Sequence, residues 1–91
     1  MGQAVVNAQD APTLALQALV WTLSVPERAD RLLAVTGADP ADLRARIDHP
    51  AVLAATVQFL LANEADLLAC AEAIGVPPQA LAEAGARLEA A

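Results

Sequence analysis

Apolar residues recur every three or four positions along most of the chain, and this spacing predicts amphipathic helices. β-branched residues are scattered, and apolar and polar residues nowhere alternate long enough to indicate a strand. Signals that start or stop helices divide the chain at intervals of roughly 10 to 15 residues. The sequence therefore predicts an all-α fold, a compact bundle of about five to six short helices. We expect a flexible N-terminal arm at residues 1–9 and a single helical domain at residues 10–91.

The predicted helix boundaries rest on residues that cap or stop helices. The first helix should begin at Asp10. Ser24 and Glu27 have the spacing of a capping box, which would start the second. Asp39 and Asn63 should cap the third and fifth helices, and glycines should supply left-handed stops. The predicted helices cover residues 10–23, 24–35, 39–47, 48–62, 63–74 and 77–88.

The segment at about residues 50–62 is apolar around most of its circumference, and Gln58 is its main polar side chain. A helix of this kind is typically surrounded by other helices. We therefore expect it to be the central helix of the bundle. The residues expected to pack around it are Val25, Ala29, Leu32, Leu33, Leu43, Ile47, Leu67, Ala71, Ile74, Leu81 and Leu88.

The first predicted helix has apolar residues on two opposite faces. Leu16, Leu19, Val20 and Leu23 form one face, and Leu14, Ala18 and Trp21 form the other. Such a helix can bury one face in the core and present the second to a partner, and tryptophan is enriched as an anchor at interfaces. We interpret Leu14, Ala18 and Trp21 as a candidate interaction surface. The alternative is that this face packs against the last helix within the monomer.

Length and charge narrow the range of partners. The chain has 91 residues, which suits one domain, and it carries a net charge of −6 without any lysine. A negative charge repels nucleic acids and anionic lipids, so we expect neither as a partner. The N-terminal residues lack the pattern of a secretion signal, and the longest apolar run is too short to span a membrane. We expect a cytoplasmic protein that binds another protein or a second copy of itself.

Most charged residues have local explanations. Helical spacing predicts ion pairs within single helices: Glu27 with Arg31, Asp42 with Arg46, Glu83 with Arg87, and Arg44 with Asp48. Arg28 is the one arginine left without such a neighbour. We therefore add Arg28 to the candidate interaction surface, as a cation free to meet a partner's carboxylate.

No pattern of residues indicates catalysis. His49, the only histidine, lies at the start of a predicted helix, where a surface position is expected. Cys70, the only cysteine, lies in mid-helix near Asp66 with no cation nearby in sequence, which is typical of a small buried residue. One histidine and one cysteine at separate places do not form a metal site. We expect no enzymatic activity, no cofactor and no metal.

The stretch LLACAEAIGVPPQAL, residues 67–81, has the spacing of a helix-turn-helix. The second helix, however, offers one cation, Arg87, alongside Glu83 and Glu89. Since phosphate contacts supply most non-specific affinity for DNA, this helix is poorly suited to that role. A helix-turn-helix-like regulator at residues 67–88 is the alternative function, and a non-catalytic module for protein interaction or self-association is the favoured one.

The chain from about Pro12 to Leu88 resembles a family of short, mainly alphaproteobacterial proteins known as domain of unknown function three-five-seven-two. The positions that carry the resemblance are Pro26, Arg31, Leu32, Leu33, Thr36, Gly37, Asp39, Pro40, Leu43, Arg44, Pro50, Phe59, Leu60, Leu61, Glu64, Leu67, Leu68, Ile74, Gly75 and Pro78. Where the family usually has large aromatic residues, this chain has Leu32, Val52 and Cys70. The resemblance implies a small cytoplasmic helical protein and brings no known activity.

Overall fold

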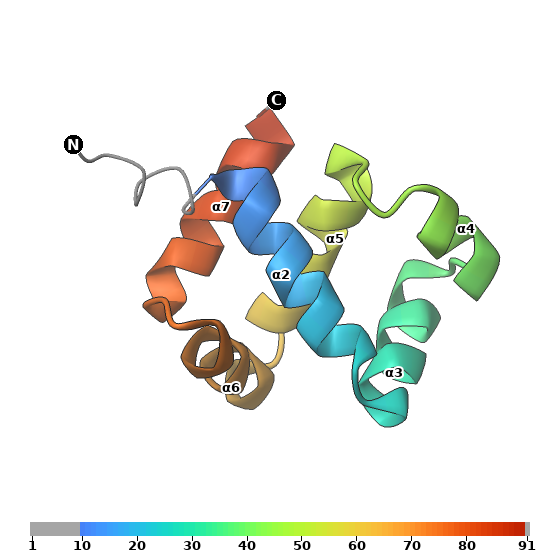
Figure 1. Ribbon diagram of the computed structural model, residues 1–91, viewed down its shortest axis with the longest axis horizontal. Coiled ribbons are helices and arrows are strands. Elements are labelled where there is room, and N and C mark those ends of the chain that lie inside the picture. Colours follow the sequence, from blue (N-terminus) through green and yellow to red (C-terminus); the bar gives the residue numbers. More distant parts are fainter. Residues whose placement is uncertain (1–9, 91) are drawn as a thin grey trace.

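Short connections join successive helices through residues 10–90, the part of the chain that the computed structural model describes (Figure 1). The helices are α2 (Ala11–Leu23), α3 (Pro26–Thr36), α4 (Pro40–Ala45), α5 (Pro50–Leu61), α6 (Glu64–Ile74) and α7 (Pro78–Ala90). No strand occurs in this range, which confirms the predicted all-α fold. The predicted arm at residues 1–9 lies outside the described residues, as does residue 91.

Local sequence signals set most helix ends. Asp39 Oδ1 accepts a hydrogen bond from the Asp42 amide at 2.9 Å, and Asn63 Oδ1 accepts one from the Asp66 amide at 3.3 Å. Both predicted N-caps are therefore confirmed. Asp10 occupies the N-cap position of α2 but forms no side-chain cap bond.

Two glycines end helices as predicted. Gly37 follows α3 with φ of 74°, and Gly75 follows α6 with φ of 78°. A side chain at either position would be strained, because this left-handed conformation is readily accessible only to glycine. The turn between α6 and α7 is thus specified locally.

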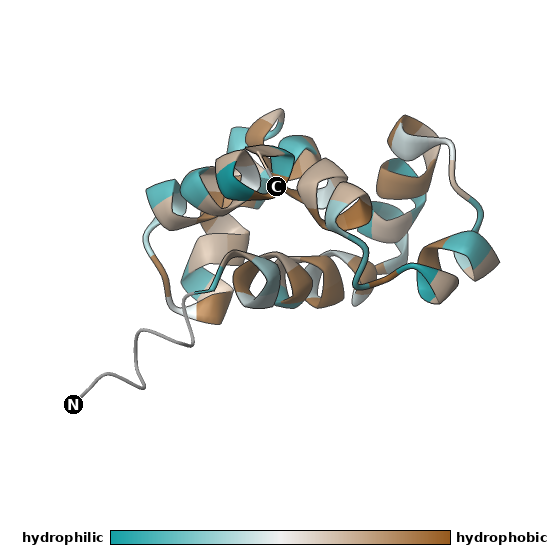
Figure 2. Ribbon diagram, turned by 90° about the horizontal axis from the view of Figure 1, so that it is seen from above, coloured by the Kyte–Doolittle hydropathy of each residue, from teal (hydrophilic) through white to brown (hydrophobic). Residues whose placement is uncertain are grey.

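The core forms where α2 and α7 pack on α5. As expected, α5 lies centrally and contacts α2, α3, α6 and α7, and α2 likewise contacts four other helices. In Figure 2, α2 follows the grey N-terminal trace along the lower side of the bundle, and the C-terminal end of α7 lies above it. The fully buried larger side chains at the centre are Leu19, Thr22, Leu53, Thr56, Val57, Leu60 and Leu81.

The α3 and α4 helices lie to one side of the bundle, across from α7 in Figure 1. Of the residues of α3, only Leu32 is fully buried, and α4 buries only Leu43. Because little apolar surface holds α3 in place, polar contacts gain importance for its position.

Among the described residues, no single helix is both long and apolar enough to cross a membrane. The α5 and α6 helices together reach that length and composition, but they meet at a bend of 117°. Six α5 residues are buried inside the bundle.

The α7 and α5 helices pack closely at Gly85. A Cβ atom at Gly85 would lie 2.7 Å from Val57 Cγ1 and 3.2 Å from Val57 Cβ. Val57 is fully buried and β-branched, so its side chain has little freedom to move aside. The absence of a side chain at Gly85 therefore allows α7 to pack directly on α5.

Gly85→Ala is expected to lower the free energy of unfolding by about 1 kcal/mol. The forced contact with Val57 costs about 1–3 kcal/mol, and the better helix propensity of alanine returns about 1 kcal/mol. In a Val57→Ala background the same change should be neutral or stabilising, because the obstructing methyl groups are gone. Urea unfolding of the four proteins measures this coupling, and equal effects of Gly85→Ala in both backgrounds would contradict it.

Candidate functional site

Two of the four residues predicted to form an interaction surface are buried in the monomer. Leu14 is 3% exposed and Ala18 is fully buried, and Leu14 lies beside Ala84 of α7. Neither residue is exposed, as the interaction surface would require, and Leu14 takes the alternative position against the last helix. The physical reason is the run of buried alanines Ala11, Ala15 and Ala18, which turns a face between the two predicted ones toward the neighbouring helices.

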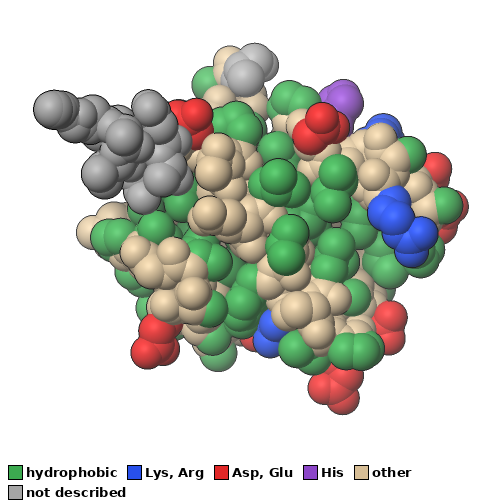
Figure 3. Space-filling model, viewed as in Figure 1, with side chains coloured by type: hydrophobic (Ala, Val, Ile, Leu, Met, Phe, Trp, Pro, Cys, Tyr) green, Lys and Arg blue, Asp and Glu red, His purple; other side chains and the backbone are tan. Residues whose placement is uncertain are grey.

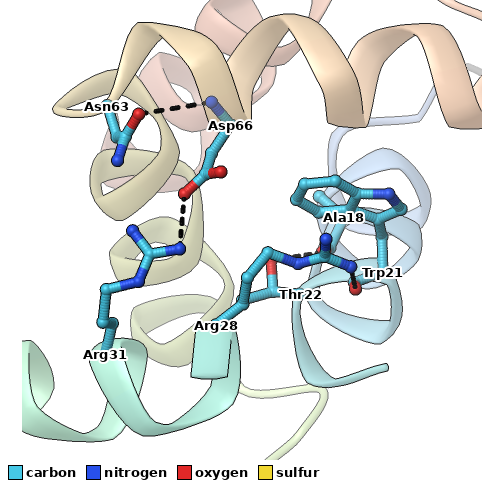
Figure 4. Close-up of polar contacts among 7 residues, drawn as sticks. All are labelled: Ala18, Trp21, Thr22, Arg28, Arg31, Asn63 and Asp66. Carbon is cyan, nitrogen blue, oxygen red and sulfur yellow. Dashed lines mark hydrogen bonds and ion pairs between the residues drawn. The ribbon is translucent and has the colours of Figure 1, made fainter. Parts of the chain in front are cut away.

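The other two predicted residues, Trp21 and Arg28, are half-buried and contact each other (Figure 4). Arg28 extends from α3 to the C-terminal end of α2, where its Nη2 donates to the Trp21 carbonyl oxygen at 2.7 Å. The guanidinium carbon lies 3.6 Å from the centroid of the Trp21 ring. A cation at this position meets the unpaired carbonyls and the negative end of the helix dipole. Arg28 therefore has a role within the fold, and the prediction that it is free is wrong.

Ser24 belongs to the same contact and does not form the predicted capping box. Its Oγ donates to the Trp21 carbonyl oxygen at 2.6 Å and accepts from Arg28 Nη2 at 3.1 Å. The N-cap of α3 is Val25, which has no side-chain cap bond. The Ser24 hydroxyl could cap the start of α3 or bond to the last turn of α2. In the structure it bonds to the Trp21 carbonyl at the end of α2. We call Trp21, Ser24 and Arg28 the α2–α3 clamp.

A second arginine joins α3 to the first turn of α6. Arg31 Nη2 lies 3.1 Å from Asp66 Oδ2, and the guanidinium carbon lies 5.9 Å from the centroid of the Phe59 ring. Figure 4 shows Asn63 bonded to the Asp66 amide beside this ion pair. Arg31 was predicted to pair with Glu27, and that prediction is wrong, because Asp66 on another helix takes its place.

The ion pair of Arg31 with Asp66 is the single one within 4.0 Å among residues 10–90. Exposed pairs contribute little in water and cost side-chain entropy, so their spacing alone does not form them. The pairs predicted from spacing but not formed are Asp42 with Arg46, Glu83 with Arg87, and Arg44 with Asp48.

Cys70 is fully buried on α6. Burial raises the pKa of its thiol from 9.0 to about 11, with smaller opposing contributions from Arg28, which lowers it, and Asp66, which raises it. The residue is thus a neutral thiol near pH 7, as expected of a small core residue. Within residues 10–90, no three His, Cys, Asp or Glu side chains lie close enough to hold a metal ion.

His49 has a structural role that its sequence context did not reveal. It occupies the N-cap position of α5, and its Nδ1 accepts a hydrogen bond from the Ala51 amide at 3.1 Å. The side chain is exposed, as predicted. Histidine is not among the preferred capping residues, which explains why sequence preferences did not indicate this bond.

An apolar groove runs between α3 and α5 and has a volume of about 680 Å³. We call it the α3–α5 groove, and its main lining residues are Arg31, Val35, Ala55, Gln58, Phe59 and Ala62. Val35 is 70% exposed at its edge, whereas Phe59 is almost completely buried in its floor. Arg31 is the one charged residue in this lining.

A second apolar surface lies on the outward side of α2. We call Leu16, Gln17 and Val20 the α2 face; with Trp21 and with Ala73 and Ile74 of α6 they line a hollow of about 430 Å³. Val20 is 57% exposed. In Figure 3, which views the molecule from the side of α2, the charged side chains lie mostly toward the edge of the face. Leu16 and Val20 of this surface thus belong to the face that was not predicted as the interaction surface.

The sequence comparisons supply a family but no activity. The family described as "Protein of unknown function (DUF3572)" matches residues 8–91. The chain belongs to this family. Comparison with curated proteins and with solved structures gave no match. Leu32, Val52 and Cys70, the three positions at which the sequence departs from the family resemblance, lie in or against the core: Leu32 and Cys70 are fully buried, and Val52 is partly buried against the core cluster.

In this member of the DUF3572 family, Arg28→Ala is expected to lower the free energy of unfolding by about 2 kcal/mol. The substitution removes a charged hydrogen bond to the end of α2 and the stacking on Trp21. Arg44→Ala is the matched control, because Arg44 is exposed and should change stability by no more than about 0.5 kcal/mol. Chemical unfolding followed by Trp21 fluorescence measures both, and equal effects would show that the clamp contributes nothing.

The raised pKa of Cys70 predicts a loss of stability at alkaline pH. Folding holds the thiol proton more tightly than the unfolded chain does, so this contribution is complete below about pH 9 and is lost as pH rises toward about 11. Unfolding free energies across this range should fall more steeply for the wild type than for Cys70→Ala. If the native protein already showed thiolate absorbance near pH 9, the ordinary pKa of a cysteine thiol, this assignment would be contradicted.

Proposed function

We propose that the protein is a non-catalytic interaction module that binds an amphipathic helix of a partner protein in the α3–α5 groove. The observation that carries this proposal is an exposed valine above an apolar floor, with Val35 at the edge and Phe59 below it. Exposed apolar surfaces of this kind are typical of protein interaction sites.

The shape of the groove suits a helix. On α5 the lining residues Ala55, Phe59 and Ala62 follow one another at three- or four-residue spacing, and α3 supplies the opposite wall. Small alanine side chains leave room for the backbone of an incoming helix. A helix that docks in this way uses apolar anchors at positions i, i+3 or i+4, and i+7.

The charge of the groove selects the kind of helix. Arg31 uses one nitrogen, Nη2, in its ion pair with Asp66, and its side chain is still 48% exposed. A guanidinium has five N–H donors, so it can bind a second carboxylate. The proposed partner helix therefore carries an acidic side chain beside its apolar anchors. The net charge of −6 disfavours the same acidic helix at other parts of the surface.

The proposal assigns a protein partner and not a nucleic acid. In the helix-turn-helix interpretation, α7 would have to read DNA, but it buries Leu81, Ala84 and Leu88 and its exposed side chains include Glu83 and Glu89. A catalytic role finds no support in the described residues, where the one cysteine is a buried neutral thiol. Both considerations favour binding without chemistry.

Selection from a library of helical peptides tests the proposal. Wild-type protein should enrich amphipathic helices that carry an acidic residue beside the apolar anchors. Val35→Glu should weaken these peptides by about tenfold or more, because it places a negative charge at the edge of the groove. Val20→Glu is the matched control on the α2 face and should leave their affinity unchanged. Peptides that bind Val35→Glu as tightly as wild type would overturn the proposal.

A further inference from the structure

We propose that the protein forms a two-fold dimer in which α2 packs antiparallel against α2 of a second copy. This interface is separate from the α3–α5 groove. The α2 helix is 13 residues long and contains no charged side chain, although the chain as a whole carries a net charge of −6. Two copies of so acidic a protein repel each other over most of their surfaces. This repulsion is smallest where an uncharged face of one copy meets an uncharged face of the other.

The outward stripe of α2 has the spacing of a helix-pairing surface. Thr13, Leu16, Gln17, Val20 and Ser24 follow one another at intervals of three or four residues, apart from the neighbours Leu16 and Gln17. Leu16 and Val20 supply apolar side chains, and the hollow beside them, between α2 and α6, can receive the same side chains from a second copy. The stripe thus provides both a ridge and a groove.

The charges at the two ends of this stripe determine the orientation. Asp10 is exposed at the N-terminal end, and Arg28 bonds to Ser24 at the C-terminal end. Arg28 keeps its bonds to Trp21 and Ser24 but remains positively charged. An antiparallel pair therefore places Asp10 of each copy near the positive charge of Arg28 in the other, and this attraction occurs twice by symmetry. A parallel pair would bring like charges together at both ends.

The centre of the stripe is also self-complementary. Gln17 lies midway between Asp10 and Ser24 in the sequence, so an antiparallel two-fold axis passes close to it. A glutamine amide carries both donors and an acceptor, and it can therefore pair with its own symmetry mate. In a two-fold interface the same patch must serve both copies, and this stripe satisfies that requirement.

Other exposed apolar residues fit a second copy less well. Leu68 of α6 is 48% exposed, but Glu64 and Glu72 lie one turn before and after it on the same helix face. Two such faces would bring carboxylates together. The α3–α5 groove has one cation in its lining and offers a second copy no matching anion at a symmetric position. Of these three surfaces, the α2 face is the one that is apolar and can also pack against the same face of a second copy.

Sedimentation and Trp21 fluorescence across concentration test the dimer. The average mass should rise from monomer toward dimer up to about 1 mM, since one helix per copy makes an interface smaller than the standard size. Trp21 borders the hollow, so its emission should shift to shorter wavelength in step with the mass. Val20→Glu should stay monomeric, and Val35→Glu should dimerise like wild type.

Cysteine cross-linking tests the orientation. Gln17→Cys should cross-link between copies under mild oxidation, because the two-fold axis brings this position next to itself. Thr13→Cys is the matched control and should not, because an antiparallel pair separates the two copies of this residue. Cys70 is fully buried and does not interfere.

Three outcomes would overturn the dimer as proposed: a wild type that stays monomeric with constant Trp21 emission, dissociation by Val35→Glu, or efficient cross-linking of Thr13→Cys. Peptide binding in the α3–α5 groove is measured separately. A monomeric wild type that still binds the selected helices therefore excludes the α2 dimer and leaves the proposed function standing.

Discussion

Close packing of small side chains among α2, α5 and α7 is the constraint on which the structure depends. The chain has one phenylalanine and one tryptophan, and its core consists mainly of leucine and alanine. Alanines on α2 and Gly85 on α7 let the helix backbones approach, and α7 meets Val57 of α5 directly. The many dispersion contacts of this close packing then provide the stabilisation that large aromatic side chains would otherwise supply.

This tight three-helix core leaves α3 and α4 outside it, and arginines hold α3 in place. Arg28 binds the end of α2, and Arg31 binds the start of α6, so α3 is tied to two different helices through its N-terminal half. Leu32 is its one fully buried residue. The Nε atom of Arg28 is buried without a hydrogen-bond partner among residues 10–90, which offsets part of what the clamp contributes.

The same arrangement creates both surfaces to which we assign binding. Since α3 is held near its start, its C-terminal half with Val35 lies beside α5, and the α3–α5 groove lies between them, with the buried Phe59 in its floor. Since the alanine side of α2 faces the core, the side with Leu16 and Val20 faces outward. Membership of the DUF3572 family assigns no activity. The proposed binding roles therefore rest on the geometry of these two surfaces.

The sequence by itself determined the class of fold, the approximate helix boundaries, the caps at Asp39 and Asn63, the stops at Gly37 and Gly75, and the burial of Cys70. These features depend on neighbours within a few residues, or on apolar periodicity within one helix. Only the tertiary structure decided which face of α2 is buried, that Arg28 binds Trp21, and that Arg31 pairs with Asp66. Those outcomes depend on helix packing: alanine spacing does not reveal which neighbour comes close, and a long arginine side chain reaches acceptors on other helices as readily as those on its own.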